Sequence, residues 1–221
     1  MAAKPKKSNL TVFVVVLVVL VFGFFAYTYF SGRGSAPQTS NLQKVQSEDH
    51  VKWARDADNV LVEYADFQCP NCKFWATTFA SFEATGSPDL ELTKKTTFVF
   101  RHFPLTSVHK NALAAAYAAE AAAKQGKFWE MHDRLFETQE TWAELADPKD
   151  HFVKLATDLN LDGEKFEKDK DSQEVKNKVE ADIQSGKDAG VQGVSTFFLN
   201  GKKYEGFESV EQLRDLLKQL K

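Results

Sequence analysis

VEYADFQCPNC, at residues 62–72, contains both cysteines of the chain, Cys69 and Cys72. An apolar run with β-branched and aromatic residues at 60–67 predicts a strand. Pro70 suits the first turn of a helix, because that position needs no backbone donor. The cysteine pair is therefore expected where a strand ends and a helix begins.

This position favours a reactive thiolate at Cys69. The unpaired N–H groups and the dipole at a helix N-terminus stabilise negative charge, which lowers the pKa of a thiol placed there. Cys72 lies nearly one helical turn further on, close enough to attack a mixed disulfide formed at Cys69. We expect Cys69 to be the exposed attacking thiol and Cys72 the more buried resolving thiol. The redox group would be the Cys69–Cys72 disulfide, with no separate cofactor.

A zinc half-site and a pair of inert structural thiols are the alternative interpretations of the two cysteines. A structural zinc site needs four protein ligands, and the sequence has neither a second cysteine pair nor histidines at a short ligand spacing. No metal site is therefore predicted within one chain, whereas a metal shared between two chains stays open. Two inert thiols would be unusual in an oxidising compartment.

Glu63 is a carboxylate in the middle of the predicted strand. Strand alternation places it on the same face as Ala65 and Phe67. Burial in an apolar strand would raise its pKa, and its place six residues before Cys69 would set it beneath the cysteine pair. There it could exchange a proton with Cys72. The alternative is an edge strand, on which Glu63 would be solvated.

An almost unbroken apolar run covers residues 10–30, and it follows three lysines. About 20 residues of helix span the roughly 30 Å hydrocarbon core of a bilayer. The run is long for a signal peptide, and the lysines favour a cytoplasmic N-terminus. We expect a cytoplasmic segment at 1–9, a single transmembrane helix at 10–30, a flexible linker at 31–47 and an extracytoplasmic domain at 48–221. A long cleaved signal peptide is the alternative.

The remaining sequence predicts an α/β fold. A second strand is expected at 96–103, parallel to the first, with a right-handed crossover through the helix at 70–85. Several helices follow, and then a hairpin at Asn200-Gly201 and an amphipathic closing helix. The net charge of −3 provides no basic field for nucleic acid. Among the histidines, His102, His109 and His132 are assigned no chemical role.

Four motifs resemble those of the DsbA-like branch of the thioredoxin superfamily. They are SEDH at 47–50, VEYADFQCPNC at 62–72, FRHFPL at 100–105 and GVQGVSTFFLNG at 190–201. The resemblance covers 47–221 and implies a thioredoxin fold with an α-helical insertion at about 106–188. It also implies a protein disulfide oxidoreductase that exchanges disulfides with secreted or envelope proteins. Glu63 matches the family's buried acid, and family members commonly work with a quinone-linked membrane redox partner.

One position departs from the family pattern. The family has a cis-proline in the loop that faces the cysteine pair, and this chain has Ser195 there. The Val194–Ser195 bond is then either cis, which is costly without proline, or trans in a loop of altered shape. The Ser195 hydroxyl could hydrogen-bond to the Cys69 sulfur. The substrate site that the resemblance implies consists of Pro70, Asn71, Val194, Ser195 and Thr196.

The same departure supports an alternative function. Without the proline, the domain could be a catalytically impaired, tethered binding or scaffold module, in which a metal or an iron–sulfur cluster bridges two copies. For an active enzyme the direction also stays open. Pro70-Asn71 lacks the histidine that stabilises the thiolate in strongly oxidising relatives. The expectation that the enzyme oxidises its substrates therefore rests only on the oxidising compartment in which it is expected to work. Reductase and isomerase directions remain alternatives.

Overall fold

The computed structural model describes residues 9–31 and 45–220. The chain forms two compact units, Met1–Pro37 and Gln38–Lys221. Most of the predicted cytoplasmic segment and of the predicted linker, namely 1–8 and 32–44, lies outside the described residues.

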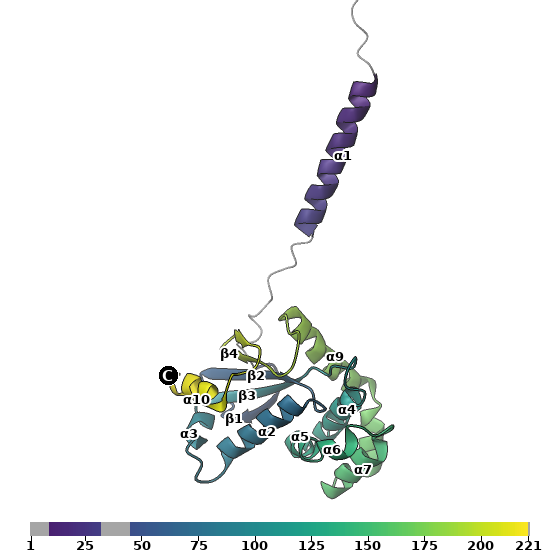
Figure 1. The fold of residues 1–221 in the computed structure, drawn as a ribbon. Coiled ribbons are helices and arrows are strands. Elements are labelled where there is room, and N and C mark those ends of the chain that lie inside the picture. Colours follow the sequence, from purple (N-terminus) through teal and green to yellow (C-terminus); the bar gives the residue numbers. More distant parts are fainter. Residues whose placement is uncertain (1–8, 32–44, 221) are drawn as a thin grey trace, which may run out of the picture. The chain divides into compact units, whose positions relative to one another are not determined.

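The first unit contains one helix, α1 at Asn9–Ser31, drawn in purple in Figure 1. Its side chains are described at 14–25 and at Tyr27, and all of these positions are exposed. Within the described part of the chain, no helix is both long enough and apolar enough to cross a membrane.

The second unit is built on a five-stranded sheet with the order β1-β3-β2-β4-β5. The strands are β1 at His50–Trp53, β2 at Asn59–Ala65, β3 at Thr96–His102, β4 at Thr196–Leu199 and β5 at Lys202–Tyr204. The parallel pairing predicted for β2 and β3 is confirmed, and the other neighbouring pairs are antiparallel. Strand β1 is an additional edge strand that the sequence did not predict.

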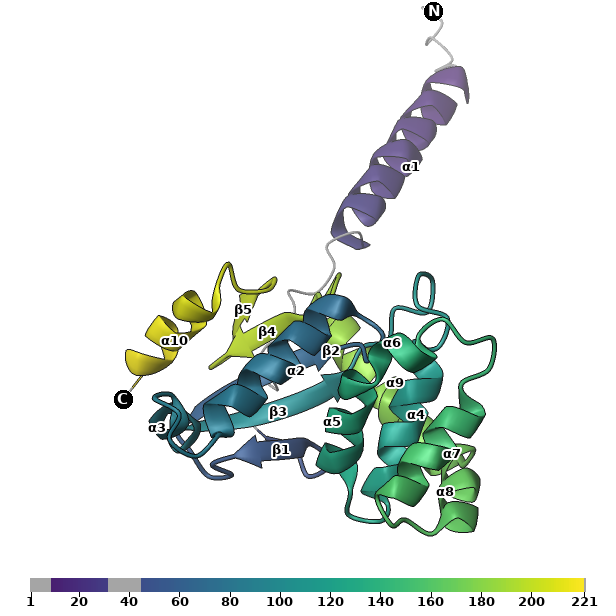
Figure 2. The same cartoon turned by 60° about the horizontal axis from the view of Figure 1, so that its bottom comes forward.

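Helix α2, at Pro70–Glu83, crosses one face of the sheet (Figure 2). Its buried side chains Trp75 and Phe79 pack with Leu61 of β2 and with Phe98 of β3. The closing helix α10, at Val210–Lys218, completes this apolar layer, and the short helix α3, at Leu90–Thr93, lies beside it. Because side chains alternate along β2, Glu63 points to the face that α2 covers.

A helical insertion separates β3 from β4. It consists of α4 at Ala112–Ala123, α5 at Phe128–Glu137, α6 at Gln139–Trp142, α7 at Lys149–Asp158, α8 at Gly163–Lys170 and α9 at Gln173–Asp188. Most alanines of α4 are buried, and their small side chains let α5, α7, α8 and α9 all contact this helix. The element order agrees with the predicted α/β fold.

Helix α9 packs on the other face of the sheet through Gly186. A Cβ at this position would lie 2.6 Å from Phe103 Cδ2 and 3.1 Å from Tyr64 Cδ1. We expect Gly186→Ala to lower the free energy of unfolding by about 1–3 kcal/mol through overpacking, although alanine is the better helix former. Gly163→Ala is the matched control, because an added Cβ there meets open space. Denaturant unfolding of the full-length chain measures both variants, and a Gly186→Ala protein as stable as wild type would contradict this packing.

Candidate active site

Cys69 is the N-cap residue of α2, and Pro70 is the first residue of that helix. The turn that precedes Cys69 follows directly from the central strand β2. Cys69 is half-buried and Cys72 is 1% exposed, and neither cysteine forms a disulfide. The strand-to-helix boundary therefore lies at the cysteine pair, as the sequence predicts, with one sulfur toward solvent and the other inside.

The environment of Cys69 stabilises its thiolate. The hydrogen bond from the Cys72 thiol is the largest influence that lowers the pKa of Cys69, to about 6, and the backbone N–H groups of Cys72 and Asn71 add to it. Partial burial and the negative charge of Asp66 oppose this shift. At neutral pH, Cys69 is therefore mostly the anionic nucleophile.

Cys72 has the opposite environment. Burial raises the pKa of the Cys72 thiol well above its ordinary value, and the neighbouring groups Cys69 and Glu63 raise it further. Its sulfur accepts hydrogen bonds from the Ser195 hydroxyl at 3.1 Å and from the Asp66 backbone N–H at 3.4 Å. The prediction that the Ser195 hydroxyl bonds to Cys69 is therefore wrong. The loop directs this hydroxyl to the buried sulfur instead.

Glu63 lies in the middle of the sheet. Its strand has β3 on one side and β4 on the other, and Glu63 is aligned with Phe100 and Phe197. It is 2% exposed, which excludes the solvated edge-strand alternative. Burial raises the pKa of Glu63 to about 8, a hydrogen bond with Ser195 lowers it in part, and the charge of Cys69 raises it. Glu63 is thus a carboxylic acid at neutral pH.

The loop before β4 faces the cysteine pair. The peptide bond between Val194 and Ser195 is cis, which decides between the two geometries that the sequence left open. The carbonyl oxygen of Val194 lies 3.9 Å from Cys69 Sγ. Ser195 and Thr196 are buried, and the Thr196 hydroxyl donates to the Gly193 carbonyl at 2.7 Å.

The predicted substrate-site residues thus fall into two groups. Pro70 and Asn71 are exposed at the start of α2, and Val194 is half-buried beside Cys69. The side chains of Ser195 and Thr196 face the protein interior.

Asp66 fixes the turn that presents Cys69. Its buried carboxylate accepts hydrogen bonds from the Gln68 backbone N–H at 2.7 Å, the Leu105 backbone N–H at 2.8 Å and His109 Nδ1 at 2.7 Å. An acidic residue directly after a buried strand is a sequence signal for such a turn. His109 was assigned no chemical role from the sequence, because nothing local identifies it as a partner of Asp66.

The helical insertion also holds the cysteine loop. Gln139, in α6, donates from Nε2 to the carbonyl oxygens of Phe67 and Cys69, at 2.7 and 3.1 Å. Gln68 donates to the carbonyl of Ala143 and accepts from the backbone N–H of Asn111. Sequence reasoning missed Gln139 and Asn111, because only the folded insertion brings them to the site.

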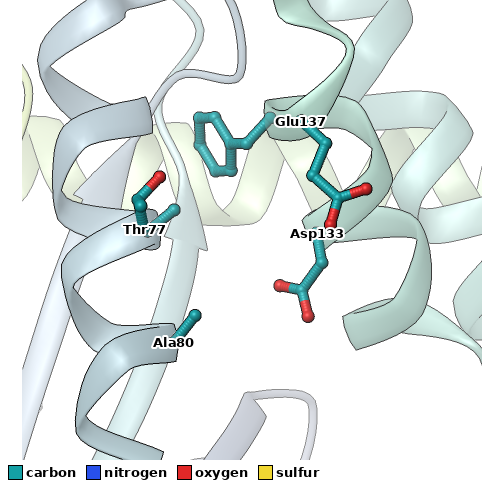
Figure 3. A pocket seen from close by; sticks show the side chains of 6 residues that line it. Thr77, Ala80, Asp133 and Glu137 are labelled. Atoms are coloured by element: carbon teal, nitrogen blue, oxygen red, sulfur yellow. The ribbon is translucent and has the colours of Figure 1, made fainter. Parts of the chain in front are cut away.

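A cavity lies beside the start of α2. Exposed apolar side chains, Phe74 and Val108, stand with Pro70 and with the two carboxylates Glu140 and Glu144 among the residues that line it. A second cavity lies between α2 and α5, where Thr77 and Ala80 stand opposite Asp133 and Glu137 (Figure 3). Neither cavity is lined by a cysteine, but the lining of the first includes Gln68 and Pro70, the two chain neighbours of Cys69.

One cluster has the composition of a metal site. His50, His102 and Glu120 bring their ligand atoms within 4.8 Å of one another. Both histidines hydrogen-bond through Nε2 to Glu120 Oε1, at 2.6 and 2.7 Å, and the buried His102 Nδ1 has no partner. A metal on Nε2 would leave an N–H on Nδ1 without the acceptor that ligating histidines normally have. The cluster is therefore better described as a set of hydrogen bonds that joins β1, β3 and α4 than as a metal centre.

Residues 46–219 match the family model described as thioredoxin. The chain belongs to the thioredoxin family. Among solved structures, α-DsbA1 from Wolbachia pipientis is 19% identical with a TM-score of 0.68, covering 83% of this chain and 96% of that one. Oxidised BdbD from Bacillus subtilis is 22% identical with a TM-score of 0.67, covering 78% and 92%. These matches confirm the DsbA-like fold.

Curated relatives of higher identity are larger proteins. The Na(+)/H(+) antiporter NhaA 3 of Salinispora tropica is 38% identical over 165 residues, which are 75% of this chain and 24% of that protein. The Na(+)/H(+) antiporter NhaA of Herminiimonas arsenicoxydans is 32% identical over 195 residues, 88% of this chain and 29% of that protein. The thioredoxin-family chain thus spans about a quarter of the length of these relatives.

The hydrogen bond from Cys72 can be tested at Cys69. In the reduced full-length chain, alkylation of Cys69 by iodoacetamide should rise with a midpoint near pH 6. Cys72→Ala removes the donor and should move the midpoint upward by about one pH unit or more. Cys72→Ser keeps a hydroxyl donor and should show a smaller shift. A wild-type midpoint near that of a free cysteine, about 8.5, would contradict the assigned environment.

The raised pKa of Glu63 predicts a pH-dependent stability. At pH values below 4.5 the carboxyl is protonated in both the native and the unfolded chain, and between 4.5 and about 8 only the unfolded chain loses the proton. Wild-type stability should fall as the pH rises through this window. Glu63→Gln has no such proton, so its stability relative to wild type should grow by up to about 1.4 kcal/mol per pH unit. Urea unfolding from pH 4 to pH 9 tests this, and a pH-independent difference would refute it.

Proposed function

We propose that the chain is an extracytoplasmic thiol:disulfide oxidoreductase that oxidises secreted or envelope proteins through Cys69 and Cys72. The observation that carries the proposal is the contrast between the two sulfurs. Cys69 is accessible and its pKa is lowered, whereas Cys72 is buried and its pKa is raised. Such a pair separates the sulfur that meets the substrate from the sulfur that closes the protein's own disulfide.

The reaction begins with the Cys69–Cys72 disulfide. A substrate thiolate attacks Cys69 Sγ, the bond between the two protein sulfurs breaks, and Cys72 leaves and takes up a proton. A second substrate thiolate then attacks the substrate sulfur of the mixed disulfide, and Cys69 leaves as a thiolate. The substrate has lost two electrons and the protein has gained them. Reoxidation requires an electron acceptor, for which we propose a membrane redox partner.

The direction follows from the thiolate. A dithiol form that is stabilised at one sulfur makes the corresponding disulfide a stronger oxidant, so the lowered pKa of Cys69 favours oxidation of substrates. The proposed location rests on the apolar run at 10–30 with its preceding lysines, which favours export of the remaining chain. Disulfides persist in compartments outside the cytoplasm.

Substrates would dock beside Cys69. The cavity at the start of α2 combines exposed apolar groups, Phe74 and Val108, with the carboxylates Glu140 and Glu144. An unfolded polypeptide segment offers apolar side chains for this rim together with a thiol for Cys69. We therefore propose unfolded protein thiols as the substrate class.

The buried position of Cys72 disfavours the scaffold alternative. A metal or cluster shared by two copies would need both sulfurs at the surface, and the Cys72 sulfur is enclosed beneath α2 with hydrogen bonds from Ser195 and Asp66. The pair is therefore better suited to exchange than to bridging.

Disulfide exchange is directly measurable. The oxidised full-length chain should oxidise a peptide containing two cysteines, and Cys69→Ser should abolish this reaction. Cys72→Ser should instead accumulate a mixed disulfide at Cys69, which mass spectrometry detects. Equilibration with glutathione should give a reduction potential less negative than about −270 mV, the value of a reducing thioredoxin. Activity that survives Cys69→Ser would disprove the proposed function, and a potential near that value would reverse its direction.

A further inference from the structure

Asp66 and His109 form a hydrogen-bonded pair beside the attacking cysteine. His109 Nδ1 lies 2.7 Å from Asp66 Oδ2, and the Asp66 side chain is fully buried whereas that of His109 is 20% exposed. The Asp66 backbone carbonyl accepts a hydrogen bond from the Cys69 backbone N–H at 3.1 Å. Asp66 therefore links the histidine to Cys69, through its carboxylate on one side and its main chain on the other.

The hydrogen bonds of Asp66 set the orientation of the imidazole ring. Both carboxylate oxygens accept backbone N–H groups, Oδ1 from Gln68 and Oδ2 from Leu105. Because the carboxylate acts as the acceptor, His109 Nδ1 carries the hydrogen that it shares with Asp66. In a neutral imidazole, Nε2 then has the free lone pair. Among the described residues, His109 has no side-chain hydrogen bond other than the one at Nδ1.

His109 also belongs to the wall of the cavity at the start of α2. It lines this cavity together with Gln68 and Pro70, the two chain neighbours of Cys69. The Nδ1 edge of the ring is turned to the buried Asp66, so the partly exposed remainder of the ring, with Nε2, is left for the cavity. A thiol that approaches Cys69 through this cavity therefore passes the imidazole.

We propose that His109 Nε2 accepts the proton of a substrate thiol as the substrate sulfur attacks Cys69 Sγ. This inference rests on the proposed function, and it adds a general base for the incoming thiol. Asp66 is then a positioning residue, which orients the ring through Nδ1 and stabilises the positive charge that the ring acquires.

The step balances in protons and electrons. The substrate S–H bond breaks as an N–H bond forms on His109. The substrate sulfur bonds to Cys69 as the Cys69–Cys72 bond breaks, and Cys72 leaves as a thiolate with the electron pair of that bond. The imidazolium then releases its proton to solvent, to which the His109 side chain is 20% exposed. In reverse, His109 returns a proton to the departing substrate sulfur.

A base is useful here because most substrate thiols arrive protonated. A free cysteine has a pKa of about 8.5, so roughly 3% of such a thiol is ionised at pH 7, and a base can raise the rate by up to about 30-fold. The lowered pKa of Cys69 gives no such help in this step, because Cys69 is held in the disulfide when the substrate arrives.

The charged side chains around the cavity are paired with one another. Lys73 pairs with Glu140 at 2.6 Å, and Lys110 pairs with Glu144 at 3.4 Å. The hydrogen bond from Lys73 lowers the pKa of Glu140, which makes this carboxylate a weaker base towards a thiol. Imidazole is the side chain that exchanges protons near neutral pH, so among the described groups at this cavity His109 is the one suited to the step.

Two matched peptides separate proton transfer from positioning. Both are unstructured and have the same sequence, except that one contains a single cysteine and the other a single selenocysteine. A selenol is already ionised at neutral pH and needs no base. The oxidised full-length chain is mixed with an excess of each peptide at pH 7, and acid quenching with mass spectrometry measures the loss of the Cys69–Cys72 disulfide. A wild-type chain that reacts with neither peptide disproves the proposed function, whatever the histidine variants show.

His109→Asn keeps an N–H donor for Asp66 but has no basic nitrogen. It should slow the reaction of the cysteine peptide by about tenfold, within the limit set by thiol ionisation, and leave that of the selenocysteine peptide at the wild-type rate. His151→Asn is the matched control, because His151 bonds to Thr138 and lines neither cavity. It should leave both rates unchanged. Equal slowing of both peptides by His109→Asn overturns the proposal, and so does an unchanged cysteine rate.

A further measurement needs only the wild-type chain. At pH 7, its ratio of selenocysteine to cysteine rate constants should be about tenfold smaller than the same ratio against oxidised glutathione, which has no imidazole beside its disulfide. Equal ratios overturn the proposal even if His109→Asn does not fold. Where that variant folds, its deficit with the cysteine peptide should vanish by about pH 10, because the substrate thiol is then ionised. A deficit that persists at that pH indicates a packing defect and also overturns the proposal.

Discussion

The active site depends on one constraint, namely that two sulfurs less than a helical turn apart must lie in opposite environments. The boundary between β2 and α2 meets this constraint. Cys69 occupies the N-cap, where backbone N–H groups stabilise an anion, and Cys72 turns inward beneath the helix. A shift of this boundary by one residue would rotate both side chains by about 100° around the helix and remove the contrast.

The boundary is fixed by polar groups from distant parts of the chain. Asp66 directly follows the last residue of β2. Its carboxylate accepts hydrogen bonds from Leu105 and His109 in the loop after β3. Gln139, from the helical insertion, holds the carbonyl oxygens of Phe67 and Cys69. The insertion therefore does more than cover the sheet, since it supplies the hydrogen bonds that hold the attacking cysteine at the helix N-terminus.

The sequence predicted those features that local patterns determine. The apolar run at 60–67 and Pro70 placed the cysteines at a strand–helix boundary, although β2 ends at Ala65, because the Asp66 carboxylate turns the chain there. The burial of Glu63 followed from the central position of β2, which the parallel pairing with β3 suggested but did not establish. The partner of Ser195 was not predictable, since 123 residues separate it from Cys72 and its direction depends on how the loop enters β4.

Serine in place of the family's proline at position 195 changes the hydrogen bonds that this position can form. A proline ring has no group that can donate a hydrogen bond, whereas the Ser195 hydroxyl can both donate and accept. In this structure the Ser195 hydroxyl donates to the buried Cys72 sulfur at 3.1 Å, and it lowers in part the raised pKa of Glu63. The residue that first suggested a catalytically impaired domain thus forms a hydrogen bond to the buried sulfur, which a proline at this position could not form.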